Sequence, residues 1–381
     1  MHRDDAVSTY LVSLLATGDE IINGDILNSN AQEIAARLFN NGMQIGMHMV
    51  AGDRIAEIEA AIHFLLKSHR ALIITGGLGP TSDDLTRYAL AAALNKELVF
   101  DEQSWHSISD RLKNLGYDKP PETNRQQALF PEGATIIPNP NGTAAGCLIQ
   151  QNEQIIIMLP GPPLECLPML EKYALPALQN QGFQKVLYHR KWLLFGVSEG
   201  QIAEELDALA KPYQCITGYR LWYPYIEFKI YSNNQDDFNT LTPLIEKTLA
   251  PYVIEDGKYS ASELLRRTLI TSNLSLYIND VATGGLLEST LRTPDTEAYL
   301  HFSQHSNATA NDLKIEVKGL DEFWQGQSSL KTTIEITFSH HTTQKQIKKE
   351  IPLRGMRVKS YAMEYACRKM YQFISEMTLA N

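Results

Sequence analysis

The chain has 381 residues, of which 44% are hydrophobic and 20% charged, and its formal net charge is −10. This length predicts two or three globular domains and the composition excludes wholesale disorder, while the acidic balance argues against a broad nucleic-acid-binding surface. No stretch approaches the roughly 20 apolar residues that a membrane span needs. The four cysteines are scattered and form no Cys-x-x-Cys pair, which suits a reducing compartment. We therefore expect a cytoplasmic protein that binds neither nucleic acid nor a membrane.

The first part of the chain alternates between apolar strands and amphipathic helices. This pattern is typical of a mainly parallel sheet that helices cover on both faces. In chain order we expect a strand over 10–16, a helix that Asn30 caps and Gly42 ends, a second helix after Asp53, a buried strand over 71–74, a helix over 84–94 and a strand over 155–159.

Beyond residue 186 the pattern changes. Strand-like runs surround a short helix up to about residue 254, which predicts a small α+β connecting module. After Gly257 we expect a helix from Ser260, a strand over 274–278, a helix after Thr283, strands over 313–317 and 332–338, and a closing helix over 356–377. The predicted domains are residues 8–175, 176–256 and 257–381.

A glycine-rich loop directly follows the buried strand over 71–74, with the sequence Thr75-Gly76-Gly77-Leu78-Gly79-Pro80-Thr81-Ser82-Asp83-Asp84-Leu85-Thr86. Glycines let the backbone approach a ligand closely, and the free N–H groups of a following helix suit a phosphate or carboxylate. No lysine follows the last glycine, and Ser82 stands where a dinucleotide fingerprint has its third glycine, so neither common phosphate motif fits. The loop therefore predicts an anion site of another kind.

Two carboxylates stand at this predicted anion site. Asp83 and Asp84 would repel a bare phosphate, so we infer a divalent cation between them and the ligand. The alternative is that both residues only cap the following helix and complement its dipole. Three more polar loops follow predicted strands, over 17–25, 139–143 and 160–163. Ligands of open α/β sheets bind at the carboxyl ends of strands, so the loops favour one shared site.

Motifs in these loops occur in a familiar order and spacing. They are Gly18-Asp19-Glu20, Asn23-Gly24, Asn28-x-Asn30, the loop from Thr75 to Thr86, Asn124-Arg125-x-Gln127-Ala128, Asn139-x-x-Gly142-Thr143-Ala144 and Leu159-Pro160-Gly161-Pro162-Pro163. The chain thereby resembles the CinA (competence/damage-inducible) family over most of residues 8–250. One departure is Ala145, where the family usually has proline. The resemblance implies an α/β protein with a molybdopterin-binding-like three-layer domain, a KH-like α+β connecting domain and a C-terminal α/β deamidase-like domain.

The resemblance also implies a homodimer and a metal-dependent ADP-ribose pyrophosphatase. We expect a divalent metal ion, with Mg, Mn and Co as candidates, held near Asp19, Asp83 and Asp84. Asp84, Asp83 and Glu20 are the predicted catalytic residues, with Asp84 or Glu20 accepting the proton of the attacking water. The predicted contacts to this small nucleotide-type substrate are Gly76, Gly77, Gly79, Thr81, Thr86, Asn23, Asn141, Gly142, Thr143, Pro160 and Gly161.

The last third resembles the family's nicotinamide-mononucleotide deamidase domain only in part. That domain carries the run Ala-Glu-Ser-Cys-Thr-Gly-Gly, and its serine is the expected nucleophile. The matching run here is Asn279-Asp280-Val281-Ala282-Thr283-Gly284-Gly285, and valine has no nucleophilic atom. We therefore expect a degenerate domain without deamidase activity. Two alternatives to the hydrolase remain open: a molybdopterin-binding protein, and a non-catalytic nucleotide sensor that recruits partners.

Overall fold

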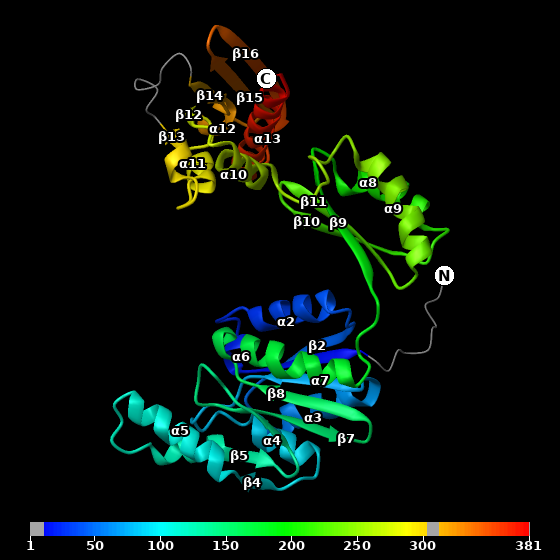
Figure 1. Ribbon diagram of the computed structural model, residues 1–381, viewed down its shortest axis with the longest axis vertical. Helices are drawn as coiled ribbons and strands as arrows, with labels where there is room; N and C mark the ends of the chain where they lie inside the picture. Colours follow the sequence, from blue (N-terminus) through cyan, green and yellow to red (C-terminus); the bar gives the residue numbers. More distant parts are fainter. Residues whose placement is uncertain (1–10, 303–311, 381) are drawn as a thin grey trace. The chain divides into compact units, whose positions relative to one another are not determined.

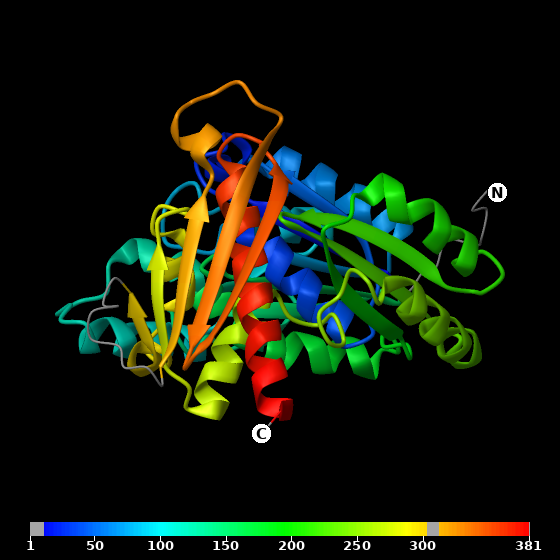
Figure 2. The same ribbon diagram turned by 90° about the horizontal axis from the view of Figure 1, so that it is seen from above.

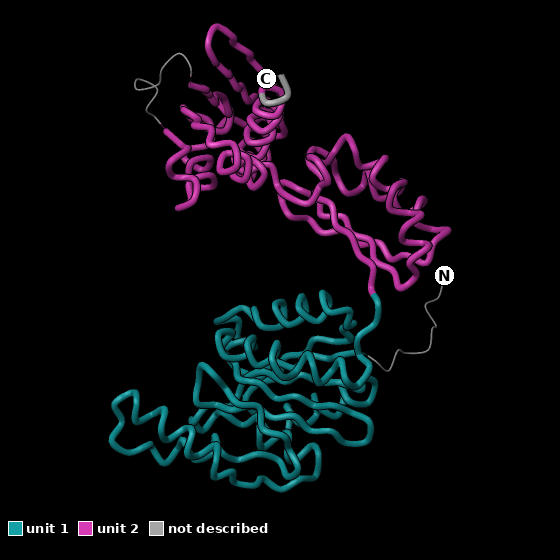
Figure 3. The backbone as a smooth tube through the Cα atoms, viewed as in Figure 1, with its two compact units in different colours: residues 1–186 teal, residues 187–381 magenta. Residues whose placement is uncertain are grey.

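The computed structural model describes residues 11–302 and 312–380. The chain, which Figure 1 shows coloured along its sequence, divides into two compact units, Met1–Val186 and Leu187–Asn381, which Figure 3 distinguishes by colour. Tyr10, with which the first predicted strand begins, lies outside the described residues. No helix in the described part of the chain is both long and apolar enough to cross a membrane.

A six-stranded sheet in the order β2-β1-β3-β8-β7-β6 forms the centre of unit 1. The four strands β2 (Ile45–Ala51), β1 (Val12–Thr17), β3 (Ala71–Thr75) and β8 (Gln154–Leu159) are parallel. β7 (Gly146–Gln151) and β6 (Thr135–Ile137) continue the sheet in the antiparallel sense. The sheet is therefore mixed, and its parallel part contains β1, β3 and β8, which are the strands that the sequence predicts.

Helices cover both faces of this sheet, and each face has its own apolar core. On one face α3 (Ile55–Ser68) and α4 (Thr86–Ala93) pack against Leu15, Leu72 and Ile74. On the other, α2 (Ser29–Asn40), α6 (Pro163–Met169) and α7 (Leu175–Asn180) pack against Val12, Leu14 and Ile73. β1 and β3 are fully buried and mainly apolar because helices enclose them on both sides, and their polar side chains are Ser13, Thr17 and Thr75.

Shorter elements complete unit 1. A one-turn helix α1 (Asp19–Ile22) follows β1, and a π-helical turn η2 (Leu170–Ala174) joins α6 to α7. An excursion between α4 and β6 contains β4 (Leu98–Phe100), α5 (Glu102–Asn114), the 3-10 helix η1 (Glu122–Ala128) and β5 (Leu129–Pro131). β4 and β5 pair with each other as a separate two-stranded sheet. This excursion brings α5 and η1 beside the candidate site described below.

Several predicted boundaries differ from the structure by a few residues. Asn28, rather than Asn30, caps α2, because its side chain accepts a hydrogen bond from the Ala31 N–H at 3.1 Å. Helix α4 begins at Thr86, two residues after the predicted start. Unit 1 extends to residue 186, beyond the predicted boundary at 175, because Leu178 and Phe183 belong to its core.

Unit 2 contains two sheets. The first is antiparallel, in the order β10-β11-β9, and α8 (Glu199–Ala210) and α9 (Gln235–Leu249) pack on it. Its strands are β9 (Tyr188–Phe195), β10 (Ile216–Trp222) and β11 (Tyr225–Ser232). This part is the predicted α+β connecting module, with α9 as a helix that the sequence analysis did not identify.

The second sheet of unit 2 has five strands in the order β13-β12-β14-β15-β16. They are β12 (Leu276–Asp280), β13 (Leu300–Phe302), β14 (Leu313–Gly319), β15 (Lys331–His340) and β16 (Thr343–Pro352). Helices α10 (Ala261–Ser272), α11 (Leu286–Leu291), α12 (Asp321–Trp324) and α13 (Arg357–Ala380) accompany it. α13 lies along one face of the sheet (Figure 2).

Candidate functional site

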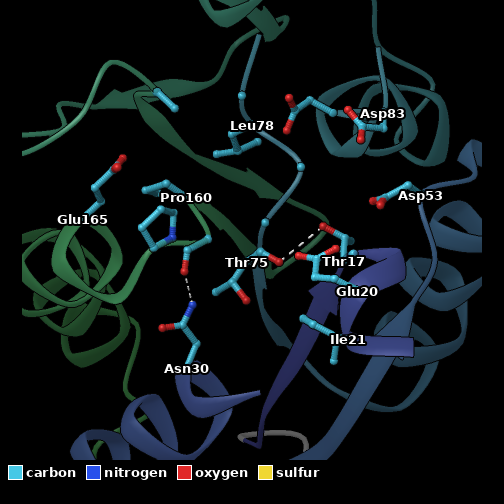
Figure 4. A pocket seen from close by; sticks show the side chains of 18 of the residues that line it. Thr17, Glu20, Ile21, Asn30, Asp53, Thr75, Leu78, Asp83, Pro160 and Glu165 are labelled. Carbon is cyan, nitrogen blue, oxygen red and sulfur yellow. Dashed lines mark hydrogen bonds between the residues drawn. The ribbon is translucent and has the colours of Figure 1, made fainter. Parts of the chain in front are cut away.

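A pocket of about 570 Å³ lies at the carboxyl ends of β1, β3 and β8. Loops that the sequence places far apart meet there, as expected for an open α/β sheet. Figure 4 shows Glu20, Asp53 and Asp83 on one side of the pocket, and Pro160 and Glu165 on the other. The predicted residues that line it are Glu20, Gly76, Gly77, Gly79, Thr81, Asp83, Asp84, Thr143, Pro160 and Gly161.

Two glycines shape the loop after β3. Gly76 and Gly77 have φ values of +102° and +62°, a region that side chains rarely adopt. A Cβ atom on Gly76 would overlap the carbonyl oxygen of Thr17, and one on Gly77 would overlap the hydroxyl of Thr86. The loop after β3 therefore packs directly on the end of β1, which places both loops around the same pocket.

Thr86 has a different position from the one predicted. Its side chain is fully buried, and its hydroxyl lies 2.8 Å from that of Thr17, which in turn donates to the carbonyl of Thr75 at 3.3 Å. Thr86 does not line the pocket. The prediction that it contacts the substrate is therefore not supported by this structure, in which Thr86 joins the two loops from behind.

Three side chains hold the carbonyl groups of the glycine-rich loop. Arg87 donates to Leu78 O at 2.6 Å and to Gly79 O at 3.4 Å, and Gln127 also donates to Leu78 O, at 3.3 Å. Gln126 donates to Gly79 O at 3.2 Å and to Thr81 O at 2.8 Å. These bonds fix the loop without any contribution from a ligand, which reduces the ordering cost of binding.

Arg87 also brings a positive charge to the loop. Its side chain is 1% exposed, and burial lowers its pKa to about 10, so the guanidinium stays charged at neutral pH. Within the described residues Arg87 forms no salt bridge with a carboxylate. A buried cation that holds the loop favours an anion in front of it, and the nearby charge of Asp84 offsets part of this effect. The sequence analysis did not identify this residue.

Asp84 determines the shape of the loop beyond Gly79. One oxygen of its carboxylate, Oδ2, accepts from the Thr81 N–H at 2.8 Å and from the Thr81 hydroxyl at 2.5 Å. The N-cap of α4 is Leu85, and no side chain makes a capping hydrogen bond there. The capping part of the alternative is therefore wrong, whereas a favourable interaction of Asp83 and Asp84 with the dipole of α4 stays a prediction. Both carboxylates face the pocket.

Asp53 is a pocket residue that the sequence analysis did not identify. The Asp19 N–H donates to Asp53 Oδ2 at 2.9 Å, and the Asp53 N–H donates to Asp19 Oδ1 at 3.2 Å, which ties the loops after β1 and β2 together. Burial raises the pKa of Asp53, and the like charges of Asp19, Glu20 and Asp83 raise it further, against a lowering by the bond from Asp19 N–H. This wall of the pocket therefore carries excess negative charge.

The predicted metal ligands are not gathered into one group. Asp19 does not line the pocket, and it lies 3.6 Å from the guanidinium of Arg54. In the parts of the chain that the structure describes, no three His, Cys, Asp or Glu side chains lie close enough together to hold a metal ion. The carboxylates that do face the pocket are Glu20, Asp53, Asp83, Asp84 and Glu165.

The opposite wall comes from the loops after β6 and β8. Asn139 donates to Glu165 Oε2 at 2.6 Å and accepts from the N–H groups of Asn141 and Gly142 at 2.9 and 2.8 Å. Asn141 donates to Leu164 O at 2.6 Å and does not line the pocket, and neither does Asn23, which ends α1. The predicted substrate contacts of these two asparagines are not supported by this geometry. Gly142 lines a neighbouring cavity instead.

Comparisons with known proteins identify the family. The family model described as the probable molybdopterin binding domain matches residues 13–180. A CinA-like protein of Shewanella amazonensis is 32% identical over 337 residues, which cover 85% of this chain and 78% of that protein. A putative competence-damage inducible protein of Clostridium novyi is 35% identical over 288 residues, which cover 73% and 68%. The chain belongs to the CinA-like family.

Solved structures resemble the CinA-like chain as well. The protein CinA from Thermoplasma acidophilum, described as of unknown function, is 29% identical, covers 45% of this chain and 99% of its own, and gives a TM-score of 0.42. The molybdopterin biosynthesis enzyme MoaB from Thermus thermophilus is 16% identical, covers 44% and 96%, and gives 0.29. The family model and the helix-covered sheet of unit 1 confirm the predicted α/β fold with a molybdopterin-binding-like domain.

The segment that matches the family's deamidase motif lies in unit 2 of the CinA-like chain. The side chain of Val281 is 56% exposed, and that of Thr283 is fully buried. Thr283 donates its hydroxyl proton to Asp280 Oδ2 and accepts from the Leu287 N–H at 3.0 Å. The Trp324 indole donates to Ala282 O at 2.8 Å. The one hydroxyl of the segment is therefore fully engaged in holding the turn from β12 to α11.

Proposed function

We propose that unit 1 hydrolyses the pyrophosphate bond of ADP-ribose or a related nucleotide diphosphate. The observation that carries this proposal is one pocket in which a preformed glycine-rich loop faces several carboxylates. The loop suits phosphate oxygens, with Arg87 behind it, whereas the carboxylates would repel them. A divalent cation between the phosphates and the carboxylates would reconcile these features. The substrate that suits such a pocket is a ligand with adjacent phosphates.

The residues of the pocket fit such a cation in chemistry, although no three of the described side chains form a ready site. Carboxylate oxygens are the ligands that Mg²⁺ and Mn²⁺ prefer, and Mg²⁺ is commonly held by one or two carboxylates while substrate phosphates and waters complete its coordination. We propose that Asp83 and Asp84 supply these carboxylates. When bound, the metal would offset phosphate charge and make a water more acidic.

The other residues have separate roles in this proposal. Gly76, Gly77 and Gly79 allow the backbone to approach the phosphates, and Thr81 is held in place by Asp84. Glu20 lines the pocket, and the absence of a side chain on Gly18 leaves room for its carboxylate. We assign Glu20 as the base that accepts a proton from the attacking water. Asp53 and Asp19 hold the loop that carries it.

The first experiment is turnover of ADP-ribose with and without a metal. We expect protein freed of metal by a chelator to be inactive, and added Mg²⁺, Mn²⁺ or Co²⁺ to restore hydrolysis, because only the cation brings phosphates close to these carboxylates. Release of AMP, followed by chromatography, measures the rate. Equal rates with chelator and with metal would show that the metal-bridged mechanism is wrong.

A second candidate follows from the family model, which is described as a probable molybdopterin binding domain. In this case the same pocket would bind a pterin phosphate without hydrolysing a nucleotide. Binding of molybdopterin by protein that does not turn over ADP-ribose with any of the three metals would favour this candidate over the hydrolase.

We further propose that the protein is a homodimer, as the family resemblance implies. An acidic surface alone would not cause association, since like charges repel. Multi-angle light scattering at micromolar concentration is expected to report twice the monomer mass of 42.8 kDa. A mass equal to that of one chain would contradict this proposal, and the protein would then act as a monomer.

A further inference from the structure

Three cations in unit 2 lie close together without an acidic partner. Lys349 belongs to the edge strand β16, and Arg368 and Lys369 belong to α13, which runs beside that strand (Figure 2). Among the described residues, none of the three forms a salt bridge with a carboxylate. The neighbouring Lys345, by contrast, is paired with Glu376 at 2.8 Å. We call Lys349, Arg368 and Lys369 the α13 cation cluster.

One aromatic ring brings the two lysines of the cluster together. Tyr365 of α13 is only 6% exposed, and the ammonium of Lys349 lies 4.9 Å from the centre of its ring. The ammonium of Lys369 lies 5.6 Å from the same centre and donates to Gln372 Oε1 at 2.9 Å. A ring attracts a cation but has no net charge, so both positive charges remain uncompensated.

Arg368 is held by the backbone and keeps part of its guanidinium free. Its Nη2 donates to the carbonyl oxygens of Val253 at 3.3 Å and Pro251 at 3.5 Å, and the guanidinium lies 5.9 Å from the centre of the Phe195 ring. In the part of the chain that the structure describes, its Nη1 and Nε make no hydrogen bond. A guanidinium fixed on one side therefore presents further N–H donors, which suit the oxygens of an anion.

The three cations disfavour one another. Partial burial lowers the pKa of Lys349, and the charge of Arg368 lowers it further. Burial also lowers the pKa of Lys369, and the charges of Arg368, Lys349 and Lys345 add to this, against a small opposite effect of Glu376. Burial lowers the pKa of Arg368 as well. An anion among these groups would replace repulsion by attraction and restore their charged forms.

The surroundings of the cluster favour a small anion over a long one. Three positive charges call for at least two negative charges, and the fork of an arginine with two lysine ammonium groups suits phosphate oxygens. Carboxylates lie beside the cluster: Glu376 binds Lys345, and Glu255 accepts from Tyr371 on the next turn of α13. These charges, and a net charge of −10 for the chain, would repel a polyanion that extends past the cluster.

We propose that the α13 cation cluster binds a small molecule that carries a phosphate group with at least two negative charges. The anion would lie between β16 and α13 and join the edge strand to the helix. Because Arg368 also holds the carbonyls of Pro251 and Val253, which precede the C-terminal sheet, binding would tighten the junction between the two sheets of unit 2. The inference does not depend on the proposed function, since no residue of unit 1 takes part.

Lysine footprinting tests the position of the site. The full-length protein is treated briefly with acetic anhydride, which modifies uncharged amines, and mass spectrometry measures each lysine. With inorganic pyrophosphate as the probe, in chelator, we expect Lys349 and Lys369 to react about tenfold more slowly than in chloride of equal ionic strength, because a bound anion favours the charged amine. Lys348, whose side chain points to the opposite face of β16, is the internal control and is expected to react equally in both.

Calorimetric titration with pyrophosphate tests the same residues by substitution. Lys349→Gln and Lys369→Gln are each expected to weaken binding about tenfold, the equivalent of one charge-assisted hydrogen bond. Lys348→Gln is the matched control and should bind as the unmodified protein does. All three substitutions remove a charge without removing a buried carboxylate partner, and a thermal melt verifies that each variant is folded.

Several results would overturn the proposal. Equal protection by chloride would reduce the effect to ionic screening. Unchanged affinity in both Lys349→Gln and Lys369→Gln would place the pyrophosphate elsewhere, for example at the glycine-rich loop of unit 1. Protection of Lys349 and Lys369 by a single-stranded oligonucleotide, but not by pyrophosphate, would assign the cluster to nucleic acid instead of a small anion.

Discussion

Asp84→Asn is expected to lower kcat for ADP-ribose by about 100-fold or more, the range for loss of a metal ligand or an acid–base group. Asparagine has nearly the same size, and its carbonyl oxygen can still accept from the Thr81 N–H, as Asp84 does now. The substitution therefore removes the charge while it keeps most of the loop geometry. Steady-state rates at saturating metal, with AMP as the measured product, check this expectation.

Two further variants separate charge from loop shape. Thr81→Ala removes the hydroxyl that bonds to Asp84 but keeps the carboxylate, so we expect a loss of no more than about tenfold, the equivalent of one net hydrogen bond. Asp110→Asn, at an exposed position 3.7 Å from Lys113, is expected to leave the rate unchanged. If Asp84→Asn stays within a few-fold of the parent, or if Thr81→Ala matches it, Asp84 only shapes the loop.

Much of the fold of unit 1 follows from local sequence. β1 and β3 are short, mainly apolar runs that are each followed by a glycine, and α2 and α3 carry apolar residues at helical spacing. A strand was expected before the polar loop 139–143, where β6 lies, but its antiparallel pairing was not predicted, and β7 was not predicted at all. β7 forms a hairpin with β8 across the two-residue turn Asn152–Glu153, and β6 pairs with β7; the sequence analysis missed this turn, which contains neither glycine nor proline. β16 was also missed, because its exposed run of Lys345, Lys348 and Lys349 lacks the apolar alternation of a half-buried strand.

The candidate site was predictable where a residue follows a strand. Gly76, Gly77, Asp83 and Pro160 line the pocket because the carboxyl ends of parallel strands meet there. Thr86 was predicted to contact the substrate but does not line the pocket. Its hydroxyl turns inward to Thr17, and its place in the motif gives no sign of this.

The sequence does not reveal residues whose partners lie far away along the chain. Asp53 follows β2, and its role depends on reciprocal bonds to Asp19, 34 positions earlier. Arg87 lies within a helix, where its burial behind the loop becomes visible only once α4 is packed. Gln126 reaches the loop through η1, at a separation of 45 residues or more. A motif places residues along the chain, and these roles depend on contacts that folding creates.

The C-terminal sheet of unit 2 is expected to release no ammonia from nicotinamide mononucleotide. Amide hydrolysis by the family's route needs a nucleophile beside a group that activates it. Val281 has no polar atom, and the hydroxyl of Thr283, which is fully buried, donates to Asp280. Incubation of the full-length protein with the nucleotide, followed by an enzyme-coupled ammonia assay, tests this expectation.

Val281→Ser asks whether the serine alone is missing. The side chain is 56% exposed, so the substitution removes little buried apolar surface and the protein should stay folded, which a thermal melt would verify. We expect no activity from this variant. The turn beside it is closed by Trp324, since a Cβ atom on Gly284 would lie 2.7 Å from the indole, and the ammonium of Lys359 lies 5.6 Å from the centre of that ring. A serine placed here has open solvent on one side and no hydrogen-bonded base among these neighbours. A misplacement of about 1 Å can already cost about 100-fold in rate.

Ammonia release by the unmodified protein would reveal a nucleophile elsewhere, and release by Val281→Ser alone would mean that the rest of a deamidase site survives in this turn.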